Sequence, residues 1–188
     1  MNIDFPTNTD KLTTFLGQLS VLRDPCTWEH SKRVSTATSS LAATVGLILD
    51  WAELDRAAFL HDIGKVAISD AIINKPTRLT NEEYKIVQQH TVLGYKLIQP
   101  LELGRVVGNA ILYHHENFDG SGYPYGLSGE AIPLEARLIR VTDVFDALTS
   151  PRPYRGAYSR LEAMKIMLEN RTCFDPTFFE AFLWMERE

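Results

Sequence analysis

The chain of 188 residues has few cysteines, no excess of basic charge and no long apolar run. Its two cysteines, Cys26 and Cys173, form no paired spacing, which favours unlinked thiols in a reducing compartment over a disulfide framework. Lysine and arginine total 19 against 24 aspartates and glutamates, and this net charge of −5 argues against binding long nucleic acid by charge alone. No apolar run approaches the ~20 residues that cross a membrane, and the first residues do not resemble a secretory leader. These absences predict a soluble cytoplasmic protein without a membrane partner, and they leave small phosphorylated ligands open.

The spacing of apolar residues predicts an all-α protein. Apolar residues recur at helical intervals in almost every segment, and no segment alternates between apolar and polar residues as a half-buried strand would. The length fits a single domain over residues 1–188, without a repeat or a linker. The predicted helices cover residues 9–24, 27–49, 52–62, 81 onward through His90, 103–115, 133–149, 159 onward and 175 onward.

Local signals mark several helix ends. Thr80 with Glu83 predicts a capping box, as does Ser159 with Glu162. Gly64 suits the left-handed turn that closes a helix, so we expect it to end the helix over 52–62. The one long interruption is the segment 116–132, where four glycines and a proline indicate a functional loop or a disordered one.

Seven side chains are candidate metal ligands, and all five histidines fall in predicted helices or at their ends. Seven nitrogen and oxygen donors are too many for one ion, and a shared carboxylate is the usual way to build a two-metal site. Imidazole with carboxylate suits iron, manganese, zinc or nickel. The candidates are His30, His61, Asp62, His90, His114, His115 and Asp143.

The strongest local motif is His61-Asp62-Ile63-Gly64-Lys65. An adjacent histidine and aspartate at a helix end can face one pocket, and the carboxylate has two oxygens with which to bridge two ions ~3.5–4 Å apart. Lys65 follows closely enough to place an ammonium beside an oxyanion that the metals hold. A surface His-Asp pair beside a solvated lysine is the alternative, but it would make the other histidine-bearing segments coincidental.

The second motif runs from His114 to Pro124. Two consecutive imidazoles on a helix point about a hundred degrees apart, so both can bind one ion only at a helix end or with the metal between helices. The glycines that follow, Gly122 among them, allow the backbone to pass close to a ligand. Tyr123 is either a packing residue or a ligand contact, and the sequence leaves both readings open.

The third motif begins at Asp143, on an apolar stretch where an unpaired carboxylate would be costly to bury. Asp146 lies three residues later on the same helix face. Arg152 and Arg155 follow in a proline-rich turn, where they can fork onto phosphate oxygens. A solvated pair of arginines is the alternative for these two residues.

Together these motifs resemble the HD-GYP family, the branch of HD-domain metal-dependent phosphohydrolases that acts on cyclic dinucleotides. The resemblance rests on residues 23–25 with His30-Ser31, on residues 61–65, on His90, on residues 114–124, and on Asp143 with residues 152–155. It implies a single HD-domain bundle of about seven helices with a long glycine-rich loop. In these terms residues 1–22 form an N-terminal helix and extension, and 23–182 form the family core, without a visible sensor or receiver domain.

The resemblance also implies roles for the candidate residues. One metal would bind His30, His61, Asp62 and Asp143, and a second would bind His90, His114, His115 and again Asp62 as the bridge. The two divalent ions would be iron or manganese in the first place, with zinc or nickel as the next choices. They would carry a bridging hydroxide that attacks phosphorus, so that cyclic di-GMP is hydrolysed to pGpG and GMP. Lys65 would stabilise the added charge, Arg152 and Arg155 would hold the second phosphate, and Asp146 would move a proton or orient a neighbour. Gly122 and Tyr123 would shape the purine pocket in a loop that can also contact protein partners.

Two alternatives and one departure accompany this hypothesis. The chain could instead hydrolyse 3'3'-cyclic GMP-AMP or another nucleotide, or it could be a receptor that binds a cyclic dinucleotide without turnover. Some family members carry a glutamate four residues before the first metal histidine, which brings in a third ion. This chain has Cys26 there, so we predict two ions rather than three.

Overall fold

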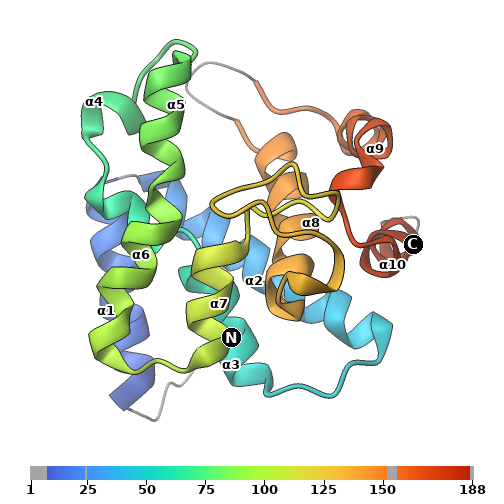
Figure 1. Ribbon diagram of the computed structural model, residues 1–188, viewed down its shortest axis with the longest axis horizontal. Helices are drawn as coiled ribbons and strands as arrows, with labels where there is room; N and C mark the ends of the chain where they lie inside the picture. Colours follow the sequence, from blue (N-terminus) through green and yellow to red (C-terminus); the bar gives the residue numbers. More distant parts are fainter. Residues whose placement is uncertain (1–7, 24, 152–155, 187–188) are drawn as a thin grey trace.

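The computed structural model describes residues 8–23, 25–151 and 156–186, and every regular element among them is a helix (Figure 1). The predicted all-α class is therefore confirmed. The α-helices of this part of the chain are α1 (Asn8–Arg23), α2 (Pro25–Val45), α3 (Trp51–Leu60), α4 (Asp70–Ile73), α5 (Asn81–Gln88), α6 (His90–Ile98), α7 (Arg105–Tyr113), α8 (Leu134–Thr149), α9 (Arg160–Glu169) and α10 (Pro176–Met185). Short 3₁₀ turns lie between them: η1 (Ile63–Ala67), η2 (Gln99–Leu101), η3 (Gly129–Ala131) and η4 (Arg171–Cys173).

The described residues form more α-helices than the seven that the resemblance implied. The short α4 was not predicted, and the helix expected to run from Asn81 through His90 is divided at Gln89, so that His90 begins α6. The imidazole Nδ1 of His90 donates to the carbonyl of Val87 at 2.7 Å, and this bond competes for an oxygen that a continuous helix would use itself. The division therefore coincides with a histidine that belongs to the candidate site.

Several helix ends follow the sequence signals. Both predicted capping boxes are present, at Thr80 before α5 and at Ser159 before α9. Asp175 accepts hydrogen bonds from the first turn of α10, and its other oxygen pairs with Arg137 on α8 at 2.6 Å. Pro133 lies one residue before α8 rather than in its first turn.

The predicted end of the second helix is wrong. Helix α2 stops at Val45 because Gly46 adopts a φ of +74°, a left-handed conformation that glycine takes readily. Ile48, which lies within the predicted range 27–49, is outside the helix and fully exposed.

Gly64 does not form the left-handed turn that was expected of it. Instead it lies where η1 crosses the start of α6, and a Cβ at this position would lie 1.9 Å from the carbonyl oxygen of His90. Gly94 on α6 meets the same crossing, since its own Cβ would lie 3.0 Å from the Gly64 nitrogen. The two glycines let η1 and α6 approach closely, which brings Asp62 next to His90.

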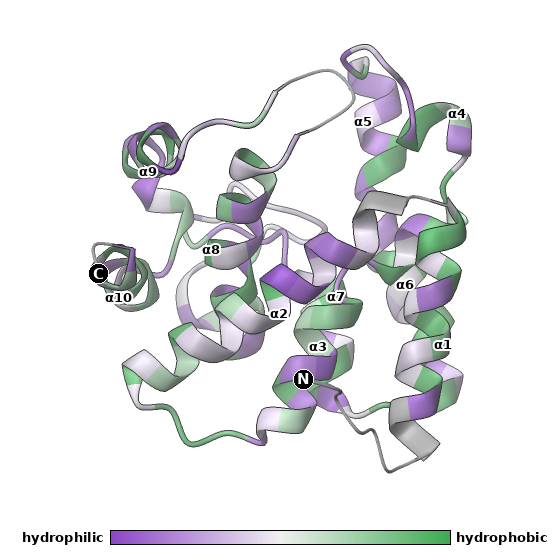
Figure 2. Ribbon diagram, turned by 180° about the vertical axis from the view of Figure 1, so that it is seen from behind, coloured by the Kyte–Doolittle hydropathy of each residue, from purple (hydrophilic) through white to green (hydrophobic). Residues whose placement is uncertain are grey.

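Two apolar clusters form the core on either side of α2, α3 and α8. The first joins these helices to α1, η1, α6 and α7, and the second joins them to α9 and α10. Figure 2 shows hydrophobic and hydrophilic residues alternating along the same helices, as amphipathic helices require. No helix among the described residues is both long and apolar enough to cross a membrane.

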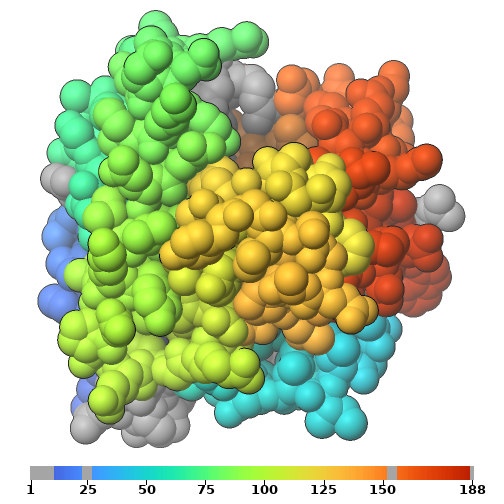
Figure 3. Space-filling model, in the orientation of Figure 1, coloured from blue at the N-terminus to red at the C-terminus, as the bar shows by residue number. Residues whose placement is uncertain are grey.

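The glycine-rich segment 116–132 is an ordered loop. It lies across the face of the molecule seen in Figure 3, between α6 and α7 on one side and η4 on the other. Phe118 donates its backbone N–H to the Cys173 carbonyl in η4 at 2.9 Å, and Thr172 donates its hydroxyl to Asp119 at 2.9 Å. The loop is therefore tied to the C-terminal part of the fold.

Candidate metal centre

The seven predicted ligand residues converge at one place in the fold. They come from elements that are distant in sequence: α2, the end of α3, the start of α6, the end of α7, and α8. Most are buried, although apolar surroundings disfavour burial of ionisable groups. The residues are His30, His61, Asp62, His90, His114, His115 and Asp143.

Asp62 lies at the centre of this group, and its two carboxylate oxygens face different neighbours. Oδ2 lies 3.7 Å from His30 Nε2 and 3.4 Å from His61 Nε2. Asp143 Oδ1 completes this first half, at 3.3 Å from His30 Nε2 and 3.7 Å from His61 Nε2. Three elements thus direct two imidazole nitrogens and two carboxylate oxygens at one point.

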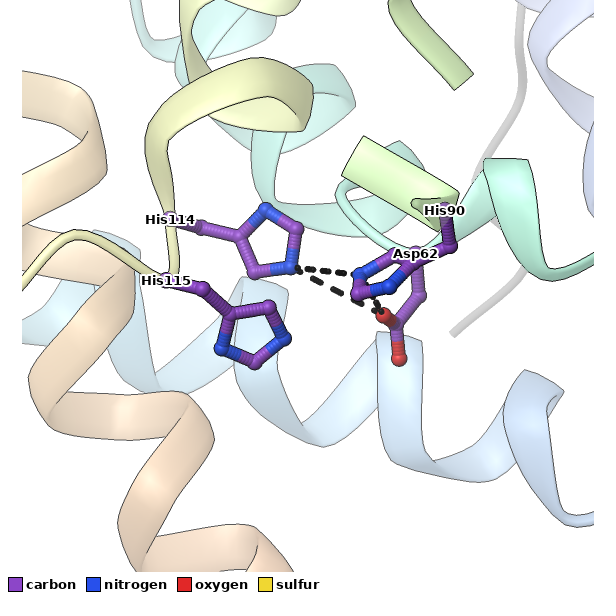
Figure 4. A group of neighbouring side chains, drawn as sticks. All are labelled: Asp62, His90, His114 and His115. Carbon is purple, nitrogen blue, oxygen red and sulfur yellow. Dashed lines mark hydrogen bonds and ion pairs between the residues drawn. The ribbon is translucent and has the colours of Figure 1, made fainter. Parts of the chain in front are cut away.

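The other oxygen of Asp62 faces the second half of the site. Oδ1 lies 3.3 Å from His90 Nε2 and 3.7 Å from His114 Nε2 (Figure 4). His115 follows His114 just beyond the end of α7, and its ring lies beside those of His90 and His114 at centroid distances of 5.1 and 4.2 Å. The consecutive histidines therefore lie at a helix end, which is one of the two arrangements that lets both reach one ion.

Four of the five imidazoles are oriented through their Nδ1 atoms. His61, His90 and His114 each donate Nδ1–H to a backbone carbonyl, at 2.7, 2.7 and 2.9 Å. His30 Nδ1 lies 2.7 Å from a carboxylate oxygen of Asp146. These bonds orient the four rings so that Nε2 faces Asp62, which is the orientation that metal-binding histidines use.

The charged groups shift one another's pKa values differently in the two halves. Burial alone lowers the pKa of His61, but Asp62 and Asp143 outweigh it and raise that pKa to about 10. Burial opposes ionisation of Asp62, yet Lys65 and His61 bring its pKa well below the usual range. His114 differs, because burial lowers its pKa to about 4. The first half therefore attracts positive charge, while the second presents neutral imidazole.

These residues fit divalent metal ions. Among the described residues, Asp62 Oδ1 is a buried oxygen that accepts no hydrogen bond, a costly state unless a cation occupies the space before it. The candidate ligand atoms form two groups, and within each group all atoms lie within 4.8 Å of one another. Asp62 belongs to both groups: the first adds His30 and His61, and the second adds His90, His114 and His115. Imidazole and carboxylate donors suit iron, manganese, zinc or nickel. The geometry supports the predicted division into two metal positions.

Lys65 and Asp146 lie beside the ligands. The Lys65 ammonium lies 2.5 Å from Asp62 Oδ2, so it faces the same space as the bridging carboxylate. Asp146 contacts His30, and it also accepts from the guanidinium of Arg33 at 2.5 and 3.0 Å. His30 and Arg33 lower the pKa of Asp146 to about 2 against the effect of burial, so it is ionised. This placement favours orientation of His30 over proton transfer by Asp146.

The glycine-rich loop packs against the second half of the site. Tyr123 stacks on the His115 ring at 4.8 Å between centroids, and its N–H donates to the His115 carbonyl at 3.1 Å. Gly122 is confined beneath, since a Cβ there would lie 2.2 Å from the Asn117 nitrogen. The buried Glu116 carboxylate accepts from the backbone N–H groups of Tyr125 and Leu127. The loop thus holds Tyr123 over a candidate ligand.

A cavity of about 590 Å³ opens beside the first half of the site. His30 and Lys65 line it, together with Arg33, Lys75 and Arg78, and none of the described residues in its lining is an aspartate or glutamate. Arg33 and Lys75 are paired with Asp146 and Glu83, which lie outside the lining. The volume is in the range of small-molecule sites, ~300–1,000 Å³. A basic cavity in a chain of net charge −5 indicates an anionic ligand.

Sequence reasoning missed several residues around the ligands. Arg33 lies three residues after His30 on α2, a spacing that would have placed it on the same face. Arg140 lies three residues before Asp143 on α8, so the same spacing would have placed it on the face of Asp143. Glu116 carries no local signal, since its backbone partners come from the folded loop. Arg152 and Arg155 lie outside the described residues, so their roles stay predictions.

Comparison with known proteins places this arrangement in a family. A family model described as "HD domain" matches residues 16–178. Cyclic di-GMP phosphodiesterase response regulator RpfG of Xanthomonas campestris is 40% identical over 168 residues, which cover 86% of this chain and 44% of that protein. The 3'3'-cGAMP-specific phosphodiesterase 3 of Vibrio cholerae is 38% identical over 172 residues, which cover 90% of this chain and 37% of that protein. An HDG"Y"P protein from Bdellovibrio bacteriovorus shares the fold, with a TM-score of 0.70 at 22% identity over 86% of this chain and 53% of that one.

The chain spans less than half the length of these two curated relatives. The matched region nevertheless contains every ligand candidate, from His30 to Asp143. The chain belongs to the HD domain family and, within it, to the HD-GYP branch that its histidine and aspartate motifs resemble.

Proposed function

We propose that this chain is a metal-dependent phosphodiesterase that hydrolyses cyclic di-GMP to pGpG and GMP. The observation that carries the proposal is the Asp62 carboxylate, whose two oxygens face two separate imidazole groups and of which one is buried without a hydrogen bond. The names of the relatives support the substrate class, because they include cyclic di-GMP phosphodiesterases.

In the proposed site each residue has a defined task. His30, His61, Asp62 and Asp143 would hold one divalent ion, and His90, His114, His115 and Asp62 would hold the other. When bound, the two ions would neutralise the phosphodiester and lower the pKa of the attacking water. Iron and manganese are our first candidates, with zinc and nickel next.

The protein's own contribution is to bind and orient the substrate. Lys65 lines the basic cavity and lies beside Asp62, so its ammonium can stabilise negative charge that develops on a phosphate oxygen there. Tyr84 also lines the cavity and offers a ring for a purine. Tyr123 packs over His115, and burial raises the pKa of its hydroxyl, so it stays neutral. We retain Arg152 and Arg155 as ligands of the second phosphate, and Gly122 with Tyr123 as the loop that shapes the pocket and can meet protein partners.

A second candidate substrate is 3'3'-cyclic GMP-AMP. A relative named as specific for that nucleotide is 38% identical to this chain, close to the 40% of a cyclic di-GMP phosphodiesterase. Overall identity therefore does not separate the two substrates. Both carry two phosphodiesters, so the same basic cavity suits either one.

The test is hydrolysis by protein purified without oxygen, with its metals counted by mass spectrometry. The protein is incubated with each cyclic dinucleotide and added iron(II) or manganese, and products are followed by chromatography. We expect linear products that disappear with a chelator, and faster turnover of cyclic di-GMP. Faster turnover of cyclic GMP-AMP would transfer the proposal to that substrate. Two bound metals without product from either nucleotide would contradict an enzyme and favour a receptor.

A further inference from the structure

The two halves of the candidate metal centre differ in charge. The first half has the Asp143 carboxylate besides the shared Asp62, and its His30 is backed by the carboxylate of Asp146 at 2.7 Å. Lys65 pairs with Asp62 and Arg33 pairs with Asp146, so these two cations offset two of the three carboxylates, and Asp143 supplies the surplus negative charge of the first half. Among the described residues, the second half has three imidazoles and the shared carboxylate. A divalent ion is attracted more strongly where more negative charge is nearby. The first position should therefore bind metal more tightly than the second.

Arg140 adds to this difference. It lies on α8, and its guanidinium Nη1 lies 3.4 Å from Nδ1 of His115, while its Nε donates to the side-chain oxygen of Asn117 at 2.9 Å. The other four candidate histidines direct Nδ1 at a carbonyl or carboxylate oxygen. His115 is thus the one candidate ligand in the described chain whose Nδ1 contact is a cation.

This contact reverses the usual support of a metal-binding histidine. A carbonyl or carboxylate that accepts from Nδ1–H makes the imidazole a better donor to metal. A guanidinium is always charged and can only donate, so it draws electron density from His115 and repels a nearby cation. The half-buried position of Arg140 limits the screening of its charge by water.

We infer that Arg140 is a positioning residue that weakens metal binding at the half of the site formed by His90, His114 and His115. This inference rests on the proposed metal centre. The two ions then load in order, the first at the half that contains Asp143 and the second, weaker and exchangeable, beside His115. Because Arg140 contacts His115 without being a ligand itself, the affinity of the weaker ion can be changed without substituting any ligand.

Arg140 also makes a structural contact, and this contact should strengthen binding of the second ion, whereas the charge of Arg140 should weaken it. Its bond to Asn117 ties α8 to the start of the glycine-rich loop, which holds Tyr123 over His115. If Arg140 served only to hold that loop, its removal would loosen His115 and weaken the second ion. The direction of the change in affinity therefore separates the two roles.

The experiment is a titration of the metal-stripped full chain with Mn²⁺. Calorimetry measures the affinity of each ion, and mass spectrometry counts the bound ions. Arg140→Met removes the charge but keeps an unbranched side chain, and Arg140→Lys keeps the charge. Asn117→Ala removes the loop contact while Arg140 remains. Arg105→Met is the matched control, since it removes one positive charge from an exposed position at the start of α7.

We expect the wild type to show one tight and one weak Mn²⁺. Arg140→Met should tighten the weak ion by about 10-fold, the scale at which residues behind metal ligands act, and leave the tight ion unchanged. Arg140→Lys, Asn117→Ala and Arg105→Met should not tighten it. A weak ion that is unchanged or weaker in Arg140→Met would overturn the inference and leave the metal centre standing. A wild type that takes up no metal would overturn the centre itself.

Discussion

Substitution of Gly64 by alanine should damage both stability and the metal centre. The added Cβ would lie 1.9 Å from the His90 carbonyl oxygen and 2.6 Å from the Gly94 nitrogen. Both are backbone atoms, so no side chain can rotate away. An ordinary contact between such atoms is longer than about 3 Å, so η1 and α6 must separate by roughly 1 Å. Overpacking of this kind costs about 1–3 kcal/mol, and we expect the upper end because two elements must move.

The same displacement would separate two proposed ligands. Asp62 precedes η1 and His90 begins α6, so their 3.3 Å contact would lengthen with the shift. Metal sites tolerate changes of about 0.2 Å in ligand distance. We therefore expect Gly64→Ala to lose the ion on the His90 side even under conditions in which the protein stays folded.

Urea denaturation followed by circular dichroism measures the free energy of unfolding, and mass spectrometry counts the metals. Gly156→Ala is the control, because a Cβ there meets no atom of the described residues within 4 Å, and its unfolding free energy should change by less than about 0.5 kcal/mol. Gly64→Ala with the stability and metal content of the wild type would refute the argument that close approach of η1 and α6 builds the site.

Three further substitutions test other parts of the account. Lys65→Ala should keep both metals and lower the turnover number by about 10²–10³-fold, as measured by steady-state hydrolysis, because it removes charge stabilisation rather than a ligand; loss of metal would contradict that role. Asp146→Asn should weaken the first ion by about 10–100-fold in a Mn²⁺ titration, since His30 loses its carboxylate partner; unchanged affinity would return Asp146 to the proton-transfer role. Asp175→Ala should lower the unfolding free energy by about 2–4 kcal/mol in urea, because it removes the α10 cap and leaves Arg137 without its buried partner; a loss under 0.5 kcal/mol would show that neither contact matters.

The convergence of the candidate ligand residues was predictable from the cost of burying them, while their role as metal ligands stays a prediction. Histidines and aspartates on apolar helical stretches are expensive to bury, so their placement at His61, Asp62 and Asp143 indicated a shared purpose before any fold was known. The helical class and both capping boxes followed from short-range patterns, which depend on neighbouring residues only.

Other features were not predicted, and most of them depend on contacts between segments that are distant in sequence. Gly64 resembled a helix-ending glycine, but its function is to admit the backbone of His90, which comes 26 residues later. The division between α5 and α6 is a local exception, because it coincides with a bond from the His90 side chain to the Val87 carbonyl three residues earlier, which periodicity does not reveal. Arg140 and Glu116 acquire their roles only when α8 and the loop fold against the site. Tertiary contacts therefore decide what Gly64 and Glu116 do.

The central claim is that Asp62 bridges two metal ions. Its most direct test is the number of metals per chain in the wild type and in Asp62→Ala, both reconstituted with Mn²⁺ or iron(II) without oxygen and checked by circular dichroism. We predict two ions in the wild type and neither in the variant, with the helical spectrum largely intact, since this one carboxylate faces both imidazole groups. An Asp62→Ala protein that still holds two ions would contradict the account.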